Sequence, residues 1–237
     1  MVVGLLLFLG FAVAFAPAAL IRTVLPAEVG VDLLEPSGTL WNGVARLYLG
    51  GQDAGLVDWR FRPVAILQGR LGYAVELSGP GHTLSGNVAA GLGAGRLEIR
   101  GSVAAAVVNR WLSVYDIAIT GAITLDGVEL TVPYDFASTA AGSASGDVTW
   151  EGGPVRYRLA GRDYAGALPP LAGHLGPALE AVVFPQDGQT PLLKAAILPN
   201  GFAKVGITML LTQLAGNPWP GSHQDHEVVL EVEEQLF

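Results

Sequence analysis

Two histidines near the C-terminal end are the side chains best placed to do chemistry. His223 and His226 stand beside Asp225 and Glu227, and imidazole nitrogens and carboxylate oxygens are donors that zinc takes in proteins. The stretch follows a Pro- and Gly-rich segment, precedes an apolar run, and lies far from the next histidine, His174. We therefore favour a solvated polar turn, and we keep a metal site at His223 and His226 as the weaker hypothesis. No cofactor is predicted.

Acidic pairs are the second group that could carry chemistry. Asp53 lies close to Asp58, and Glu231 lies close to Glu233 and Glu234. None stands in the apolar surroundings that shift a carboxyl pKa for acid or base catalysis. The chain also has no nucleophile next to a base and no phosphate-binding glycine loop. The sequence therefore predicts that the protein is not an enzyme.

Composition excludes a further class of function. The net charge is −8, with 21 acidic and 13 basic residues, and the only lysines are Lys194 and Lys204. Nucleic-acid binding needs clustered basic side chains, so no nucleic acid is expected as a partner. The 32 glycines predict many tight turns and bulges. A hydrophobic content of 51% with only 14% charged residues predicts a large apolar interior or an apolar groove.

The first stretch of the chain, Val2 to Ile21, is apolar and carries no charge. As a helix it would cover about 30 Å, the thickness of the hydrocarbon core of a bilayer. It predicts a transmembrane anchor over residues 1–22, followed by one domain over residues 23–237. The alternative is a cleaved signal peptide, because Ala14-Phe15-Ala16 has the small-x-small pattern of a cleavage site. The length of the run and the lack of a basic residue before it favour the anchor.

Alternating apolar and polar residues predict strands over most of the remaining chain. The period of two is clear in Trp41–Leu49, in Val57–Phe61 and in Leu71–Leu77. The short turns between such runs require antiparallel neighbours. The predicted fold is mainly β, an antiparallel curved sheet or sandwich. The tryptophans at strand positions are expected in the core rather than on a ligand-stacking surface.

An internal echo suggests that this β domain has two similar units. Ser145–Gly152 resembles Ser37–Gly43, which would give units of about 37–100 and 114–237.

Five further segments have local predictions. Pro63–Gly69 predicts a turn or a short helix. Alanine-rich Ser102–Leu112 predicts a helix capped by Ser102. Asp126-Gly127 predicts a two-residue hairpin turn between apolar strands. Asp163–Gly176 is punctuated by Pro and Gly and predicts a loop, and Phe202–Leu211 predicts a strand.

Three short motifs carry a resemblance to a known family. They are Gly38-Thr39-Leu40-Trp41-x-Gly43, Val57-x-Trp59-x-x-x-Pro63 and Leu67-x-Gly69-x-Leu71. Together with the apolar start and the β-rich remainder, they resemble protein N of the bacterial type II (general) secretion pathway. The resemblance implies a single-pass inner-membrane protein with its N-terminus in the cytoplasm and its domain in the periplasm. It also implies an accessory role beside other inner-membrane secretion subunits, with no catalytic residue. The missing basic N-terminal flank departs from this pattern.

The expected mode of action is contact through strand edges or an apolar face. The motif residues are expected to be structural: Gly38, Trp41, Gly43, Trp59, Pro63 and Gly69. One alternative is a module that handles lipid or another hydrophobe in an apolar trough, so lipid stays a candidate partner. A third hypothesis, a metal-dependent hydrolase, would use His223 and His226.

Overall fold

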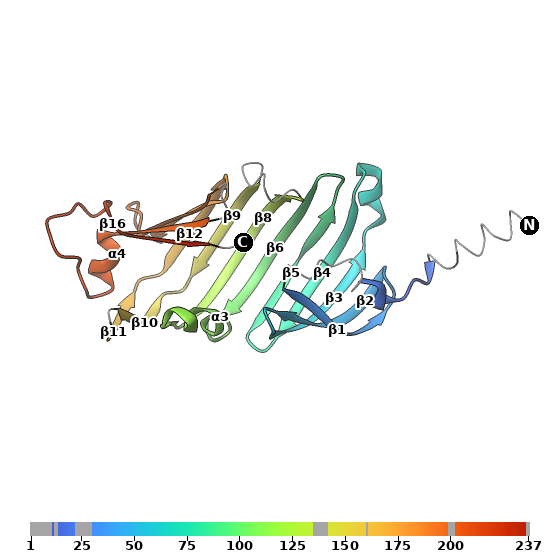
Figure 1. The fold of residues 1–237 in the computed structure, drawn as a ribbon, viewed down its shortest axis with the longest axis horizontal. Helices are drawn as coiled ribbons and strands as arrows, with labels where there is room; N and C mark the ends of the chain where they lie inside the picture. Colours follow the sequence, from blue (N-terminus) through green and yellow to red (C-terminus); the bar gives the residue numbers. More distant parts are fainter. Residues whose placement is uncertain are drawn as a thin grey trace, which may run out of the picture. The chain divides into compact units, whose positions relative to one another are not determined.

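The computed structural model describes residues 11, 14–21, 30–134, 142–159, 161–198 and 202–235. Its contacts divide the chain into two compact units, Met1–Ala89 and Ala90–Phe237. Both units are built mainly of antiparallel strands (Figure 1). The predicted mainly β, antiparallel fold is therefore confirmed.

The first unit has its strands in chain order, β1-β2-β3-β4-β5. Each strand follows the one before it through a short connection, as the alternating runs predict. A short 3-10 helix, η3, joins β3 to β4, and another, η1, precedes the sheet. The elements are η1 (Ala18–Leu20), β1 (Val31–Gly38), β2 (Asn42–Leu49), β3 (Gln52–Phe61), η3 (Pro63–Gln68), β4 (Leu71–Gly79) and β5 (His82–Ala90).

The core of the first unit lies on one face of these strands. Leu33, Ala45 and Trp59 are buried there, with Val57 and Val75 packed against them. These residues occupy the apolar positions of the alternation, because successive side chains of a strand point to opposite faces. The tryptophan at position 59 is thus in the core, as its strand position predicts.

Residues just before the sheet complete that core. Ala18 in η1 is only 1% exposed and belongs to the same cluster. Pro17 forms a β-bridge with Thr39, and the amide of Leu40 donates to the carbonyl oxygen of Ala16 at 2.8 Å. Consequently the last residues of the predicted anchor are packed against the first unit.

Among the described residues, no helix is both long enough and apolar enough to cross a bilayer. Most of Val2–Ile21 lies outside the described residues. The transmembrane anchor over residues 1–22 therefore stays a prediction.

The second unit contains two sheets. One has the strand order β6-β8-β9-β12-β13-β14-β15-β16, and the other is three-stranded with the order β11-β10-β7. The elements are β6 (Ala94–Ala104), α3 (Ala105–Leu112), η4 (Ser113–Tyr115), β7 (Ile117–Ile119), β8 (Ala122–Pro133), β9 (Ser143–Trp150), β10 (Gly153–Leu159), β11 (Arg162–Leu168), β12 (Leu171–Pro177), β13 (Glu180–Pro185), β14 (Leu193–Ile197), β15 (Phe202–Thr208), α4 (Met209–Leu214) and β16 (Val228–Gln235).

The predicted hairpin at Asp126-Gly127 is wrong. Both residues lie inside β8, a strand of 12 residues paired with β6 on one side and β9 on the other. The register with β9 shifts between Asp126 and Glu129, and Gly127 has a φ of 58°. The glycine thus serves a β-bulge, which needs the same positive φ as a tight turn.

Three other local predictions also need correction. Ser102 is part of β6, and the helix begins at Ala105 without a side-chain cap. Asp163–Gly176 forms most of β11 and β12, since backbone pairing with β10 and β9 outweighs the local turn signals. The predicted strand over Phe202–Leu211 ends at Thr208, where α4 follows.

Each unit contains a tryptophan that donates to a nearby loop. Trp59 Nε1 donates to the carbonyl oxygens of Thr39 and Leu40, in the loop before β2. Trp150 Nε1 donates at 2.7 Å to the carbonyl oxygen of Thr120, in the loop before β8. The arrangement around Trp150 therefore matches that of Trp59, whereas the sequence echo aligned Trp150 with Trp41.

We expect Trp59→Ala to lower the free energy of unfolding by about 3–5 kcal/mol, because it leaves a cavity in a packed core. Urea or thermal unfolding measures the change. Trp111→Ala is the matched control, since Trp111 in α3 is 43% exposed, and it should cost about 1 kcal/mol or less. Equal effects of the two substitutions would contradict the placement of Trp59 in the core.

Candidate functional site

Four of the motif residues lie in the first unit in or beside β1, β2 and β3, and one of them, Gly43, lies against the indole ring of another, Trp59. Gly43 pairs with Trp59 across β2 and β3, and a Cβ at Gly43 would lie 2.4 Å from Cζ2 of Trp59. Gly38 has a φ of +94°, and a Cβ there would lie 2.5 Å from the carbonyl oxygen of Asn42. Both glycines therefore occupy positions that a larger side chain cannot take without shifting the backbone or the ring.

The fourth of these residues, Trp41, lies next to the end of β3. Its ring contacts Phe61 edge-on, with the ring centroids 4.8 Å apart, and Phe61 in turn contacts Tyr73 at 5.5 Å. The amide of Phe61 donates to the carbonyl oxygen of Trp41 at 2.6 Å. Burial raises the pKa of Tyr73 above its ordinary value, as expected for a phenol in this aromatic cluster.

The remaining two motif residues mark the ends of η3. Pro63 is at the start of the helix, where its missing N–H is no loss. Gly69 ends it with a φ of 67°, the left-handed conformation that favours glycine. The chain therefore protrudes as a single short helix between β3 and β4, in the place where the sequence predicted a turn or short helix.

This helix exposes apolar side chains. Leu67 is 87% exposed, Val64 66%, Ile66 56%, and Leu71 at the start of β4 is 51% exposed. We call these four residues the apolar ridge. The ridge lies at the same end of the first unit as Ala16. The amide of Leu40 donates a hydrogen bond to Ala16, and the neighbouring Trp41 accepts one from Phe61, which lies just before η3.

The structure does not assemble a metal site from the histidines. Within the described part of the chain, no three His, Cys, Asp or Glu side chains are grouped to hold a metal ion. His223 instead pairs with Glu227, with Nδ1 and Oε1 3.2 Å apart. The hydrogen bond to His223, aided by the amide of Gln224, holds the pKa of Glu227 below its ordinary value.

The acidic residues considered from sequence also have ordinary partners. Asp53 pairs with Arg46 at 2.7 Å, and both side chains are exposed. Glu231 and Glu233 lie 2.8 and 3.9 Å from the ammonium group of Lys204. The hydrogen bond to Glu231 is the main reason that the pKa of Lys204 is raised. Such exposed pairs are typical of a solvated surface.

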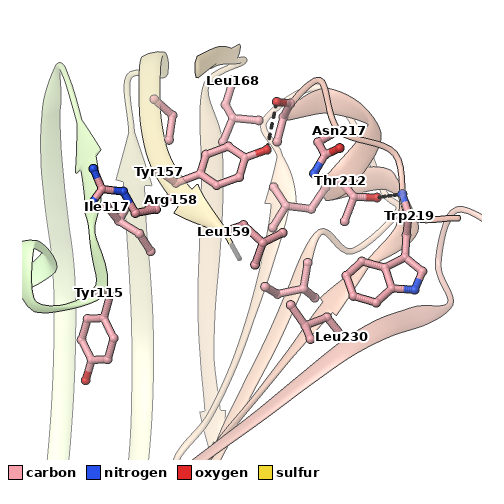
Figure 2. Close-up of a pocket in the computed structure, with 14 residues that line it drawn as sticks. Tyr115, Ile117, Tyr157, Arg158, Leu159, Leu168, Thr212, Asn217, Trp219 and Leu230 are labelled. Atoms are coloured by element: carbon pink, nitrogen blue, oxygen red, sulfur yellow. Dashed lines mark hydrogen bonds between the residues drawn. The ribbon is translucent and has the colours of Figure 1, made fainter. Parts of the chain in front are cut away.

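The second unit has an apolar pocket (Figure 2), and sequence reasoning, which predicted an apolar interior or groove from composition, did not locate it. Its volume is about 250 Å³, and its walls come from β7, β10 and β11 on one side and from β15, β16 and α4 on the other. Burial is the main cause that raises the pKa of Tyr157, whose hydroxyl lies in this wall. Alternation in β10 places Val155, Tyr157 and Leu159 on one face, but no local pattern reveals which distant elements face them.

The fold defines a mainly β protein with exposed apolar side chains on η3 and an apolar pocket in its second unit. Residues 29–196 match the family model described as "Type II secretion system (T2SS), protein N". This range covers more than half of the chain and contains all six motif residues. The chain therefore belongs to this family and is involved in type II secretion. Comparisons with curated proteins and with solved structures find no match.

We expect Gly43→Ala to destabilise the protein by about 1–3 kcal/mol, because the added methyl group would overlap the Trp59 ring and the carbonyl oxygen of Ser37. Chemical unfolding measures the change. Gly93→Ala is the control, since nothing lies within 4 Å of a Cβ at Gly93. If Gly43→Ala unfolds at the same denaturant concentration as Gly93→Ala, the close approach does not exist in solution.

We expect His223→Ala to raise the pKa of Glu227 toward its ordinary value, because the hydrogen bond to His223 is the largest cause of the lowering. A carboxyl-detected NMR titration measures it. His226→Ala should have a smaller effect, since His226 acts only through its charge. Because the pKa is lowered on folding, this contact stabilises above the ordinary carboxyl pKa, and its contribution is lost as pH falls through the lowered value.

Proposed function

We propose that the protein is an accessory inner-membrane component of the type II secretion apparatus. In this proposal the segment over residues 1–22 anchors it in a single pass, and the β domain over residues 23–237 lies in the periplasm. It acts without catalysis, by contact with other inner-membrane secretion subunits. The observation that carries the proposal is the apolar ridge, four exposed apolar side chains on a segment bounded by family-motif residues.

Two observations support a retained anchor. Ala16 and Ala18 are buried in the first unit, and Ala16 accepts a hydrogen bond from Leu40. Cleavage after Ala16 would separate this residue from the fold that buries it. A chain that keeps these residues also places the apolar ridge at the end of the unit from which the anchor leaves.

The ridge is a better contact surface than the outer strands. Exposed apolar patches on folded proteins commonly mark interaction sites. By contrast, the outermost strands β1 and β16 carry acidic residues, including Asp32 on β1 and Glu231 and Glu233 on β16. Charges on an outer strand discourage pairing with other strands. We therefore assign subunit contact to the ridge rather than to strand pairing.

The motif residues act through the ridge in this proposal. Pro63 and Gly69 set the ends of η3, and Gly38, Gly43 and Trp59 hold the strands that precede it. In this proposal their role is structural, because they fix where the apolar side chains protrude.

We expect Leu67→Glu to lower secretion of an exported substrate and to reduce crosslinking to other secretion subunits by about tenfold or more, since a charge replaces a central apolar anchor. The control is Leu92→Glu, because Leu92 is fully exposed outside the ridge. Both variants should fold normally, as judged by their melting temperatures.

Two results would overturn this assignment. One is normal secretion by Leu67→Glu at normal protein levels. The other is crosslinking of the ridge to lipid alone, which would make it a membrane-contact surface.

A further inference from the structure

The apolar pocket of the second unit is walled by side chains from its two sheets. Ile117 and Leu159 line it from the three-stranded sheet, while Ile207, Leu211 and Leu230 line it from β15, α4 and β16. Figure 2 shows Ile117 on the side of the three-stranded sheet, and Trp219 and Leu230 toward the other side. Protein interiors are normally packed to the density of organic crystals, so unfilled apolar walls of this kind favour an apolar occupant.

Two of the hydroxyl groups in the walls, those of Tyr157 and Thr212, already have hydrogen-bond partners within the protein. Tyr157 donates from its hydroxyl to the carbonyl oxygen of Ala215 at 3.4 Å. Thr212 Oγ1 donates to the carbonyl oxygen of Met209 and accepts from the amide of Trp219. These hydrogen bonds point the polar groups toward the polypeptide backbone, so the pocket presents mainly hydrocarbon to a ligand. An occupant that needs hydrogen bonds, such as a peptide backbone, is therefore disfavoured.

The volume of the pocket fits a single hydrocarbon chain. A cavity of about 150 Å³ accommodates the six carbons of benzene, so about 250 Å³ would accommodate a chain of about ten carbons. The pocket is thus too small for two long acyl chains side by side.

The charges around the pocket select against an anionic head group. Arg158 is the charged residue in the wall, and its guanidinium already pairs with Asp163 at 2.8 Å and with Asp116 at 3.9 Å. Tyr115, at another point of the wall, donates its hydroxyl to Glu234 at 2.7 Å. One cation therefore stands beside three carboxylates, which repel an anion near the opening.

The geometry points to a binding site for one linear hydrocarbon chain of an uncharged or zwitterionic amphiphile. The hydrocarbon chain lies between the two sheets, and the head group of the amphiphile stays in solvent. This site is additional to the secretion contact proposed for the first unit. Several of its walls come from residues beyond 196, outside the range that matches the family model.

The test uses a dodecylphosphocholine analogue that carries a photoreactive diazirine at the end of its chain. The probe is added to the full-length chain in the cell fraction that contains it, irradiated, and its adducts are mapped by mass spectrometry. We expect adducts on α4, β10 and β16, and competition by unlabelled dodecylphosphocholine. A hexyl analogue should label the same elements far less, because fewer methylene groups are buried.

Leu230→Trp and Val232→Trp are the matched variants. Both residues are on β16 at positions of the same parity, but only Leu230 lines the pocket, and Val232 is 47% exposed. Leu230→Trp should reduce labelling by about tenfold, because the indole takes the space of several methylene groups, while Val232→Trp should leave it unchanged. If Leu230→Trp fails to fold, Ala215→Leu fills the same space from the end of α4.

Three results would overturn the inference. Labelling spread evenly over exposed apolar surfaces, the apolar ridge included, would mean that the pocket is not a specific site for a hydrocarbon chain. Equal labelling of the two tryptophan variants would place the site elsewhere. Displacement of the probe by an apolar peptide but not by dodecylphosphocholine would make the pocket a receptor for a protein side chain. Each readout is separate from secretion, so failure here and failure of the ridge assignment are distinguishable.

Discussion

The packing of the first unit depends on how the indole ring of Trp59 fits into its core. A buried tryptophan needs a partner for its ring N–H and space for a large apolar body. Trp59 obtains the partner from the carbonyl oxygens of Thr39 and Leu40, and it obtains the space because Gly43 has no side chain. The same loop then binds the N-terminal residues, through Leu40 to Ala16. The strand pairing, the loop before β2 and the approach of the N-terminal segment are thus coupled through one ring.

The second unit satisfies its buried tryptophan in the same way, with Trp150 donating to Thr120. Its surroundings nevertheless differ, because two sheets face each other across the apolar pocket. The pocket is lined by β10 together with β15 and β16, elements that are distant in the chain. A filled core in one unit and a recessed apolar space in the other therefore arise from similar strand patterns.

The two apolar surfaces differ in their relation to the family. The apolar ridge lies within residues 29–196 and next to the motif residues, whereas the pocket takes Leu211 and Leu230 from outside that range. The ridge exposes four apolar side chains and suits contact with another surface. The pocket is concave and lined mainly by apolar side chains, and it suits a small apolar ligand. The proposed secretion role thus rests on the apolar ridge, whereas the inferred hydrocarbon-binding site rests on the pocket of the second unit.

The sequence alone was sufficient for the mainly β class and for β2, β3 and β4 of the first unit, because alternation and short turns act locally, but it did not predict β1. It also located η3, since Pro63 and Gly69 constrain their own backbone. It wrongly predicted a turn at Asp126-Gly127 and a loop over Asp163–Gly176, where pairing with neighbouring strands decided the conformation. Only the tertiary structure showed that His223 pairs with Glu227 and that a pocket exists, because both depend on which side chains packing brings together. Backbone preferences are encoded residue by residue, but the space between two sheets is decided by the position of every element around it.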